Sequence, residues 1–368
     1  MKARTLFIVS SLEVGGVEMY LLRFLAFCKN ELHPVVLCRS GVRGALAVDY
    51  EDLGVKVDVK YIGYLSLNNH FWLYSYLKRN NFSAICDFSG DFSGLIMLLG
   101  RVIGARKRIS FYRESEYQFR KSKIKLIYAK VSNYLVKKNA TVILSNSKVA
   151  LNNFHPEWGL GGNKYKVISN GIPLIETSID NRTIYRNKLK IPKNSVIIGH
   201  LGRYTAAKNH SYIISLVDTI VERYPNVYFL LYGKEVKEAV SKIARNYAHN
   251  KHIVTPGVCT DLASFFSTID LFVFPSINEG QPNALLEAMI SKTPVIANGI
   301  ESIKEIVPDE AAIALFDGTI DHFQMKIQAF LNMKKSQKFY DYSLVSNKVR
   351  KNHSPEERFN DFLSELSV

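Results

Sequence analysis

The stretch that decides the fold is LFVFPSINEGQPNALLEAM, residues 271–289. It opens with four apolar residues, Leu271–Phe274, which are typical of a buried strand. Pro, Asn and Gly then interrupt the pattern, and a helix is predicted over Asn283–Ser291, with Asn283 as its N-cap. A strand that leads through a short loop into a helix predicts a parallel sheet covered by helices.

The same alternation of short apolar runs and longer amphipathic runs fills the 368 residues. It predicts an α/β protein with two doubly wound domains, because the strands form two separate series. The expected strands are Thr5–Ser10, Pro34–Cys38, Val55–Val59, Ala84–Phe88, Arg108–Phe111, Thr141–Ser145, Lys166–Ser169, Val196–His200, Val227–Tyr232, His252–Thr255, Leu271–Phe274, Pro294–Ala297 and Ala312–Leu315. The expected helices include Val17–Lys29, Ile124–Lys138, Asn209–Arg223 and Asp261–Thr268.

The boundary between the domains is expected after the turn Asn170-Gly171-Ile172-Pro173, where Gly and Pro interrupt the pattern. We therefore expect one domain over residues 1–172 and a second over residues 173–350. Residues 351–368 contain Pro355–Leu366, whose apolar side chains fall on one helical face. This segment is predicted to be a helix that packs back on the first domain.

The charge is uneven along the chain. The whole chain holds 48 Lys and Arg against 33 Asp and Glu, a net charge of +15. Residues 1–165 hold 24 basic and 12 acidic residues, so they carry +12 of this excess. Such a region is expected to attract a nucleic acid, an anionic lipid or a phosphorylated acceptor, or it is a solubilising surface.

Other features narrow the class of protein. The four cysteines (Cys28, Cys38, Cys86 and Cys259) match no zinc or redox spacing, which favours the reducing cytosol. The most apolar stretch, Leu95–Ala105, is too short to span a membrane. We also expect no signal peptide, and predict a cytoplasmic protein.

Two glycines follow the first strand, in SSLEVGGVEMY. Gly15 and Gly16 would let a ligand approach the backbone at the start of a helix, whose N–H groups favour an anion. The dinucleotide fingerprint Gly-x-Gly-x-x-Gly is absent. A plain tight turn and a ligand loop both fit this motif.

Charged residues follow two strands of the second series. Arg203 and Lys208 follow the strand Val196–His200, at the end of a parallel sheet where such sheets bind ligands, and two cations there suit a diphosphate. Glu279 and Glu287 follow Leu271–Phe274. Their carboxylates can accept hydrogen bonds from sugar hydroxyls, Glu287 from a vicinal diol such as ribose. Solvated surface charges are the alternative interpretation of Arg203 and Lys208.

With these motifs in order, the chain resembles the retaining, metal-independent glycosyltransferases of the GT-B fold that carry a Glu-x7-Glu motif, the family 4-like enzymes of bacterial polysaccharide synthesis. The resemblance covers roughly residues 5–366. It rests on Gly15-Gly16-Val17-Glu18, Ser169-Asn170-Gly171-Ile172, Leu201-Gly202-Arg203 with Lys208-Asn209, and PSINEGQPNALLEAM.

The resemblance implies two Rossmann-like domains around a cleft, the first for the acceptor and the second for a nucleotide sugar, with UDP- or GDP-linked donors favoured. It implies that Arg203 and Lys208 hold the diphosphate, Glu287 the ribose and Glu279 the transferred sugar. The backbone near Val258 would meet the base, and Gly15 and Gly16 the phosphates. The remaining donor contacts that it implies are Gly280, Gln281, Asn283, Ala284 and Leu285.

Two positions depart from the family pattern. Arg113 aligns where the family often has a His that contacts the reacting sugar; an Arg can stabilise developing charge but cannot act as a general acid or base at neutral pH. Asn298-Gly299 stands in place of the common Gly-Gly pair. We expect Arg113, Arg203, Lys208 and Glu279 to serve catalysis.

The predicted function is a hexosyltransferase that moves a sugar, with retention and without a metal or other cofactor, to a glycan or lipid-linked acceptor for cell-surface polysaccharide or lipopolysaccharide. No Asp-x-Asp triplet occurs in the chain. Alternatives are an inactive sugar-nucleotide binder, which Arg113 would permit, and a related phosphorylase or epimerase. A nucleic-acid binder is disfavoured because it explains none of the strand-end motifs.

The basic stretch Tyr117–Lys138 has two interpretations. Its lysines and interleaved aromatic and aliphatic residues suit peripheral attachment to an anionic membrane surface. It also fits an ordinary helix whose Ile124, Ile127, Tyr128 and Val131 face the core.

Overall fold

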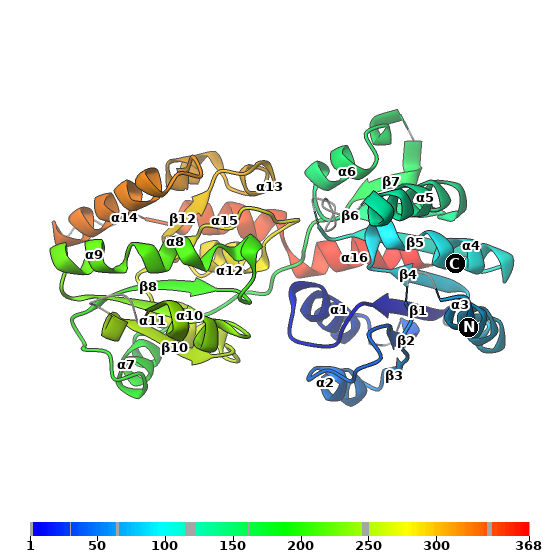
Figure 1. Cartoon of the computed structure of the whole chain (residues 1–368), viewed down its shortest axis with the longest axis horizontal. Coiled ribbons are helices and arrows are strands. Elements are labelled where there is room, and N and C mark those ends of the chain that lie inside the picture. The colour runs from blue at the N-terminus through cyan, green and yellow to red at the C-terminus, as the bar shows by residue number, and fades with distance from the viewer. Residues whose placement is uncertain are drawn as a thin grey trace. The chain divides into compact units, whose positions relative to one another are not determined.

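A computed structural model describes residues 3–29, 31–63, 66–114, 123–160, 162–244, 250–336 and 341–367. The chain divides into two compact units (Figure 1). Unit 1 comprises Met1–Gly171 and His353–Val368, and unit 2 comprises Ile172–Asn352. No helix of the described ranges is both long and apolar enough to cross a membrane.

Unit 1 is built on a sheet of seven parallel strands in the order β3-β2-β1-β4-β5-β6-β7. The strand order reverses between β1 and β4, and the carboxyl ends at such a reversal are where α/β sheets bind ligands. The strands are β1 (Ala3–Val9), β2 (Leu32–Cys38), β3 (Lys56–Val59), β4 (Ala84–Asp87), β5 (Lys107–Tyr112), β6 (Val142–Ser145) and β7 (Tyr165–Val167).

Helices cover both faces of this sheet, each over its own apolar cluster. One face carries α1 (Gly16–Phe27), α2 (Ala47–Asp52) and α16 (Pro355–Leu366). The other carries α3 (Leu67–Asn80), α4 (Gly94–Val102), α5 (Lys123–Asn139) and α6 (Lys148–Phe154). Short 3-10 turns complete the unit at Gly90–Phe92, Trp158–Leu160 and Gly162–Lys164.

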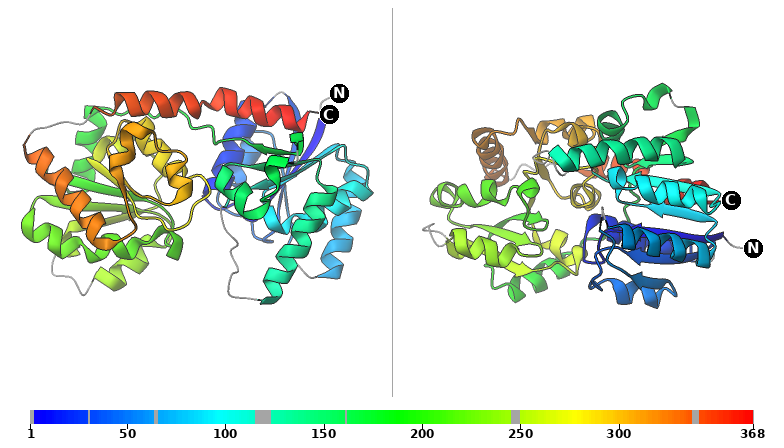
Figure 2. Two further views of the ribbon diagram at one scale, coloured as in Figure 1. Left: turned by 90° about the horizontal axis from the view of Figure 1, so that it is seen from above. Right: turned by 45° about the vertical axis from the view of Figure 1, so that its right-hand side comes forward.

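The C-terminal helix α16 packs on unit 1, as the sequence predicts; it is red in Figure 2. Its buried rings Phe359 and Phe362 meet α1, where the ring centroids of Phe24 and Phe362 lie 4.5 Å apart. Gly171 allows the close approach of the chain to α16, because a Cβ there would lie 2.8 Å from the Cα of Pro355. Aromatic packing therefore holds the end of the chain on the unit where the chain begins.

Unit 2 is built on six parallel strands in the order β10-β9-β8-β11-β12-β13, with the reversal between β8 and β11. The strands β11 and β12 are buried throughout and apolar except at Asn298, as expected of parallel strands covered on both faces. The strands are β8 (Val196–Leu201), β9 (Val227–Tyr232), β10 (Ile253–Gly257), β11 (Leu271–Phe274), β12 (Val295–Asn298) and β13 (Leu315–Phe316).

The helices of unit 2 also form two layers. One face of the sheet packs against α7 (Ile179–Lys188), α11 (Leu262–Thr268), α12 (Asn283–Ile290), α13 (Glu301–Lys304) and α15 (Ser343–Asn352). The other packs against α8 (His210–Ser215), α9 (Val217–Arg223), α10 (Val236–Ala244) and α14 (Ile320–Lys335). The 3-10 turns are Ala206–Lys208, Asn250–His252 and Asp309–Ala314.

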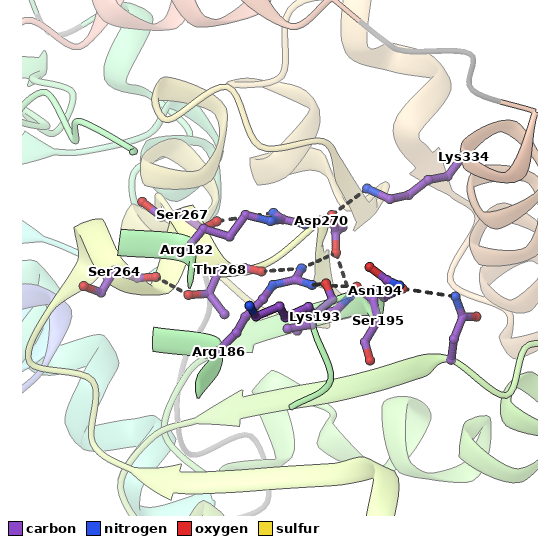
Figure 3. A network of polar contacts seen from close by, with 12 residues as sticks. Arg182, Arg186, Lys193, Asn194, Ser195, Ser264, Ser267, Thr268, Asp270 and Lys334 are labelled. Atoms are coloured by element: carbon purple, nitrogen blue, oxygen red, sulfur yellow. Dashed lines mark hydrogen bonds and ion pairs between the residues drawn. The ribbon is translucent and has the colours of Figure 1, made fainter. Parts of the chain in front are cut away.

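A buried carboxylate fastens helices to the amino end of β11 (Figure 3). Asp270 directly precedes β11, and its side chain is 2% exposed. Its carboxylate oxygens form ion pairs with nitrogens of Arg182 (2.6 Å) and Arg186 (2.9 Å) on α7 and of Lys334 (2.5 Å) on α14. Burial alone would raise the pKa of Asp270, but the charges of Lys334 and Arg182 outweigh it and hold the pKa below its ordinary value.

The predicted fold class is confirmed, with small differences at element ends. All thirteen predicted strands are present, but Ala312 lies in the 3-10 turn that precedes the short strand β13. The predicted helix Asn209–Arg223 is two helices, α8 and α9, which meet at Leu216. Asn283 does not cap α12: Pro282 occupies the N-cap position and Asn283 is the first helical residue.

Candidate functional site

The predicted ligand residues of unit 2 gather at the carboxyl edge of its sheet, where β8 and β11 end side by side. The loop after β8 carries Arg203 and Lys208, and the loop after β11 carries Glu279. The main chains of the two loops are joined, because the N–H of Ile277 donates to the carbonyl of Ala207 at 2.8 Å. The topology thus brings together residues that are more than 70 positions apart.

The loop after β8 is held by its neighbours. Gly202 donates its N–H to the carbonyl of Tyr232, and Tyr204 donates to that of Lys234, both at 3.0 Å. Gly233 follows β9 with a φ of +156°, and a Cβ there would collide with the carbonyl of Gly202. Only glycine allows this close approach, so the loop has a fixed course.

The two cations of this loop differ in their surroundings. The side chain of Arg203 is exposed. The ammonium of Lys208 donates to Glu279 Oε1 at 2.6 Å and lies 4.8 Å from the ring centroid of Phe274. The sequence did not predict this ion pair, although it predicted both residues as site residues.

Helix α12 presents its N-terminus and one carboxylate at the same edge. The N-cap residue Pro282 makes no side-chain cap hydrogen bond, and the backbone N–H groups of the first turn have no acceptor within the helix. The side chain of Leu285 is fully buried in the core, so only its main chain can meet a ligand. Glu287 lies one turn further along and is 4% exposed. A helix N-terminus favours an anion through its dipole and its backbone N–H groups.

Three more predicted residues lie at this edge. Val258, directly after β10, is nearly half exposed, and Gly280 and Gln281 are buried in the loop before α12. Burial raises the pKa of the neighbouring Cys259 to about 12, and the charge of Glu287 adds to the rise.

A histidine pair under the loop after β8 was missed by the sequence analysis. The rings of His200 and His210 are fully buried, with centroids 4.7 Å apart. His200 Nδ1 lies 2.9 Å from the carbonyl of Val273, so it donates there. Burial lowers the pKa of His210 to about 4 and lowers that of His200 well below its ordinary value. The sequence offered a signal, since His200 is the penultimate residue of β8 and His210 is the first residue of α8.

The departure at Asn298 has a structural role. Its Nδ2 donates to the carbonyl of Ser276 at 3.1 Å, which ties the end of β12 to the loop after β11. Gly299 donates its N–H to the carbonyl of Phe316 at 2.8 Å. The side chain therefore stabilises the loop that holds Glu279.

The remaining predicted residues, Gly15, Gly16 and Arg113, lie in unit 1. Gly15 is the N-cap of α1, with extended backbone and no side-chain cap. A Cβ on Gly15 would collide with the carboxylate of Glu18, whereas a Cβ on Gly16 would meet nothing within 4 Å. Gly16 therefore borders open space at the start of the helix.

Arg113 follows β5 and is 9% exposed. Its guanidinium carbon lies 4.0 Å from the ring centroid of Tyr20 and 5.1 Å from that of Phe111. Burial lowers the pKa of Arg113 to about 10, against smaller opposing effects of Tyr20 and Glu18. It stays charged at neutral pH.

Part of the basic stretch, residues 117–122, lies outside the described residues. The rest forms α5, where the expectation of a core-facing stripe is wrong at Ile127 and Val131, which are 63% and 54% exposed. The side chain of Ile124 is also outside the described residues. In the described ranges no three His, Cys, Asp or Glu side chains are grouped as a metal site.

Comparisons with known proteins agree with this layout. Residues 181–343, all in unit 2, match the family model of the glycosyl transferases group 1. The chain is 27% identical over 310 residues to the capsular polysaccharide biosynthesis glycosyltransferase CapH of Staphylococcus aureus, covering 82% of this chain and 83% of CapH. It is 24% identical over 272 residues to the Escherichia coli UDP-Gal:alpha-D-GlcNAc-diphosphoundecaprenol alpha-1,3-galactosyltransferase, covering 71% and 67%.

The fold is that of solved glycosyltransferases. The crystal structure of Anabaena HepE in complex with UDP and glucose superposes with a TM-score of 0.81 and 17% identity over the full length of both chains. A structure of WaaG, a glycosyltransferase involved in lipopolysaccharide biosynthesis, gives a TM-score of 0.71, 13% identity and 99% coverage of each chain. The GT-B fold and the resemblance to group 1 glycosyltransferases are confirmed, whereas retention and metal independence stay predictions.

Proposed function

We propose that this relative of the group 1 glycosyltransferases transfers a hexose from a nucleotide sugar to a glycan or lipid-linked acceptor, with retention of anomeric configuration and without a metal. The observation that carries the proposal is the gathering of Arg203, Lys208, the α12 N-terminus and Glu287 at one sheet edge of unit 2. Two cations and a helix N-terminus match a diphosphate, and the carboxylate matches a ribose diol.

Without a donor, Lys208 and Glu279 are paired with each other. When the donor binds, its diphosphate competes for the ammonium of Lys208. Glu279 is then free to accept hydrogen bonds from hydroxyls of the transferred sugar. In this scheme Glu279 positions the sugar and forms no covalent bond with it.

The chemical step breaks the bond between the anomeric carbon and the diphosphate oxygen. Negative charge grows on the leaving phosphate, and fixed positive groups must stabilise it. At an effective dielectric near 20, one unit charge at about 4 Å is worth about 4 kcal/mol, so Arg203 and Lys208 together are sufficient to matter. The acceptor oxygen attacks the face that the phosphate leaves, and its proton passes to that phosphate.

The acceptor and the cellular role are proposed from the relatives. CapH is named for capsular polysaccharide biosynthesis, and the Escherichia coli relative acts on a diphosphoundecaprenol-linked sugar. We accordingly place this reaction in cell-surface polysaccharide synthesis, on the cytoplasmic face of a membrane that carries the acceptor. UDP is the favoured nucleotide, since the HepE structure contains UDP.

Helix α5 is the proposed membrane contact. Its sequence has five lysines and no acidic residue. Ile127, Val131 and Tyr134 are each more than half exposed, and their spacing of four and three residues puts them on one face. Lys130 is exposed beside them, and the ammonium of Lys138 lies 4.9 Å from the ring centroid of Tyr134. An apolar stripe flanked by lysines fits the surface of an anionic bilayer.

Vesicle sedimentation tests this contact. At low salt the protein should bind phosphatidylglycerol vesicles and not phosphatidylcholine vesicles, and Ile127→Ser with Val131→Ser should abolish binding. Ile179→Ser with Ile184→Ser is the control, because these residues of α7 in unit 2 are at least as exposed as Ile127 and Val131. A protein that ignores anionic vesicles while its transfer activity is intact would contradict the membrane proposal.

A thermal-shift screen against UDP-, GDP-, ADP- and dTDP-sugars tests the donor assignment. A ligand at 100 times its Kd should stabilise the protein by about 2.7 kcal/mol. One nucleotide class should raise the Tm, and its slow hydrolysis to the free nucleoside diphosphate should be measurable. Binding without hydrolysis or transfer would favour an inactive binder, the alternative that Arg113 permits. No shift with any nucleotide would refute the proposed donor site.

A further inference from the structure

Arg113 carries a feature that the donor site does not use. Two of its nitrogens, Nε and Nη1, are buried and have no hydrogen-bond partner. In the part of the chain that the structure describes, Arg113 forms no ion pair, and its contacts are the ring faces of Tyr20 and Phe111. Charged groups that are nine-tenths buried are normally paired.

The aromatic contacts do not explain the burial. A cation–π contact is weaker than the cost of removing a guanidinium from water. Glu18, on the first turn of α1, only offsets part of that cost through its field. An unpaired charge in this setting is a common property of binding sites, where a ligand completes the pairing.

The position of Arg113 is that of a ligand-binding residue. It directly follows β5, and in register Tyr112 pairs with Ser145, the last residue of β6, so Asn146 directly follows the neighbouring strand. The Oδ1 of Asn146 is likewise buried without a partner, and so is the hydroxyl of Tyr20. Arg113 can only donate, whereas an amide oxygen and a phenol can accept hydrogen bonds from sugar hydroxyls.

On the basis of the proposed transferase function, we infer that Arg113 binds an anionic group, a carboxylate or a phosphate, on the acceptor glycan. The donor diphosphate is an anion too, but unit 2 supplies its partners in Arg203, Lys208 and α12. Arg113 belongs to unit 1, whose residues 1–165 hold twice as many basic as acidic residues. Arg113 is thus a specificity residue for a charged acceptor.

Small probes replace the unidentified acceptor in the test. Binding of D-glucuronate, D-glucose 1-phosphate and neutral D-glucose is measured by ligand-observed NMR with UDP at saturation. The charged probes should bind at least about tenfold more tightly than glucose. The stronger of the two charged probes identifies the carboxylate or the phosphate as the natural group. Equal binding of all three probes would overturn the inference.

Variants assign the effect to the residue. Arg113→Gln should reduce binding of the charged probes about tenfold or more and leave the Kd for UDP within about twofold. Arg113→Lys keeps the charge, loses the planar fork, and should bind with an intermediate affinity. Arg106→Gln is the control, since Arg106 is an exposed cation just before β5. A loss of UDP binding in Arg113→Gln with unchanged probe binding would assign the guanidinium to the donor instead.

Stability gives a second readout that does not depend on any probe. Arg113→Met removes an unpaired buried charge and keeps apolar contact with Tyr20, so the ligand-free variant should have a higher Tm than the wild type. A clearly lower Tm would show that Arg113 serves the fold and would refute the inference. Repeating the probe titrations in Arg203→Ala/Lys208→Ala separates the two proposals. Probe binding should persist there even if the donor assignment in unit 2 fails.

Discussion

Charged side chains have opposite roles at the two ends of the parallel strands in unit 2, here called the amino edge and the carboxyl edge of the sheet. At the amino edge, the carboxylate of Asp270 is buried and bound by three cations, and the network fastens α7 and α14 to β11 (Figure 3). At the carboxyl edge, Arg203 is exposed and Lys208 has one exchangeable partner, Glu279. The buried charge of Asp270, paired with three cations, stabilises the fold. The more exposed charges of Arg203 and Lys208 remain available to a ligand.

The largest effect is expected from Asp270→Asn. The substitution leaves Arg182, Arg186 and Lys334 without their common counter-charge, and breaking a buried ion pair in this way costs about 3–5 kcal/mol. Urea unfolding followed by circular dichroism measures the change in the free energy of unfolding. Asp309→Asn, at an exposed position, is the control and should change it by less than about 0.5 kcal/mol. A loss below about 1 kcal/mol for Asp270→Asn would contradict the claim that the buried ion pairs at the amino edge stabilise the fold.

Lys208→Ala should show the opposite profile. Loss of one positive group that stabilises the leaving phosphate should reduce the transfer rate about 10²–10³-fold. The free energy of unfolding should change by less than about 1 kcal/mol, since Lys208 is partly exposed to solvent. Steady-state kinetics with the donor found in the screen, beside Lys237→Ala as an exposed control, measure the effect. If the variant unfolds while its folded fraction is fully active, Lys208 stabilises the fold and does not take part in the transfer.

As the pH falls, stability should be lost first at the carboxyl edge, through His210, and only at lower pH at the amino edge, through Asp270. Burial lowers the pKa of His210 from 6.5 to about 4, so the unfolded state binds more protons and stability is lost as the pH falls from 6.5 towards 4. The pKa of Asp270 is below its ordinary 3.8, so its contribution is lost only at lower pH. His210→Phe should therefore flatten the fall in the free energy of unfolding between pH 6.5 and 4.5. Asp270→Asn should leave that slope unchanged. A changed slope in Asp270→Asn would indicate that protonation at the amino edge is coupled to protonation of His210.

The smallest effect on stability is expected at Gly16 in unit 1. A Cβ at this position meets nothing within 4 Å, so Gly16→Val should change the free energy of unfolding by less than about 1 kcal/mol. Transfer activity should nevertheless fall, because the added side chain fills the space at the N-terminus of α1 that we expect a ligand to approach. Kinetics and urea unfolding of the same preparation test this. Unchanged activity would limit the functional charges and loops to unit 2.

The sequence predicted the strands well because buried parallel strands are short apolar runs, such as Leu271–Phe274, that need no knowledge of their neighbours. It also predicted that Arg203, Lys208 and Glu279 follow strand ends of the second sheet, while their role as ligand residues stays a prediction. It could not predict the pairing of Lys208 with Glu279 or the burial of Arg113, because both depend on contacts between segments far apart in the chain. It assigned the cap of α12 to Asn283, since residue preference does not fix a cap to within one position.

Asp270 belongs to no sequence motif, yet its ion pairs hold α7 and α14 at the amino end of β11. An acidic residue before an apolar strand resembles any surface residue until its three cations are placed around it. Residue types at strand carboxyl ends therefore allow a prediction about ligands from sequence alone, whereas the role of the same types at amino ends is recognised only once the fold is known.

A crystal structure of the protein with UDP would locate the donor site. We expect the diphosphate at the carboxyl edge of the unit 2 sheet, within hydrogen-bond distance of Arg203 and Lys208, with the ribose on Glu287. The amino edge offers a rival pocket of about 410 Å³, lined by residues that include Arg182, Asp270 and Lys334. Density for UDP in that pocket, with Lys208 still paired to Glu279, would contradict the account.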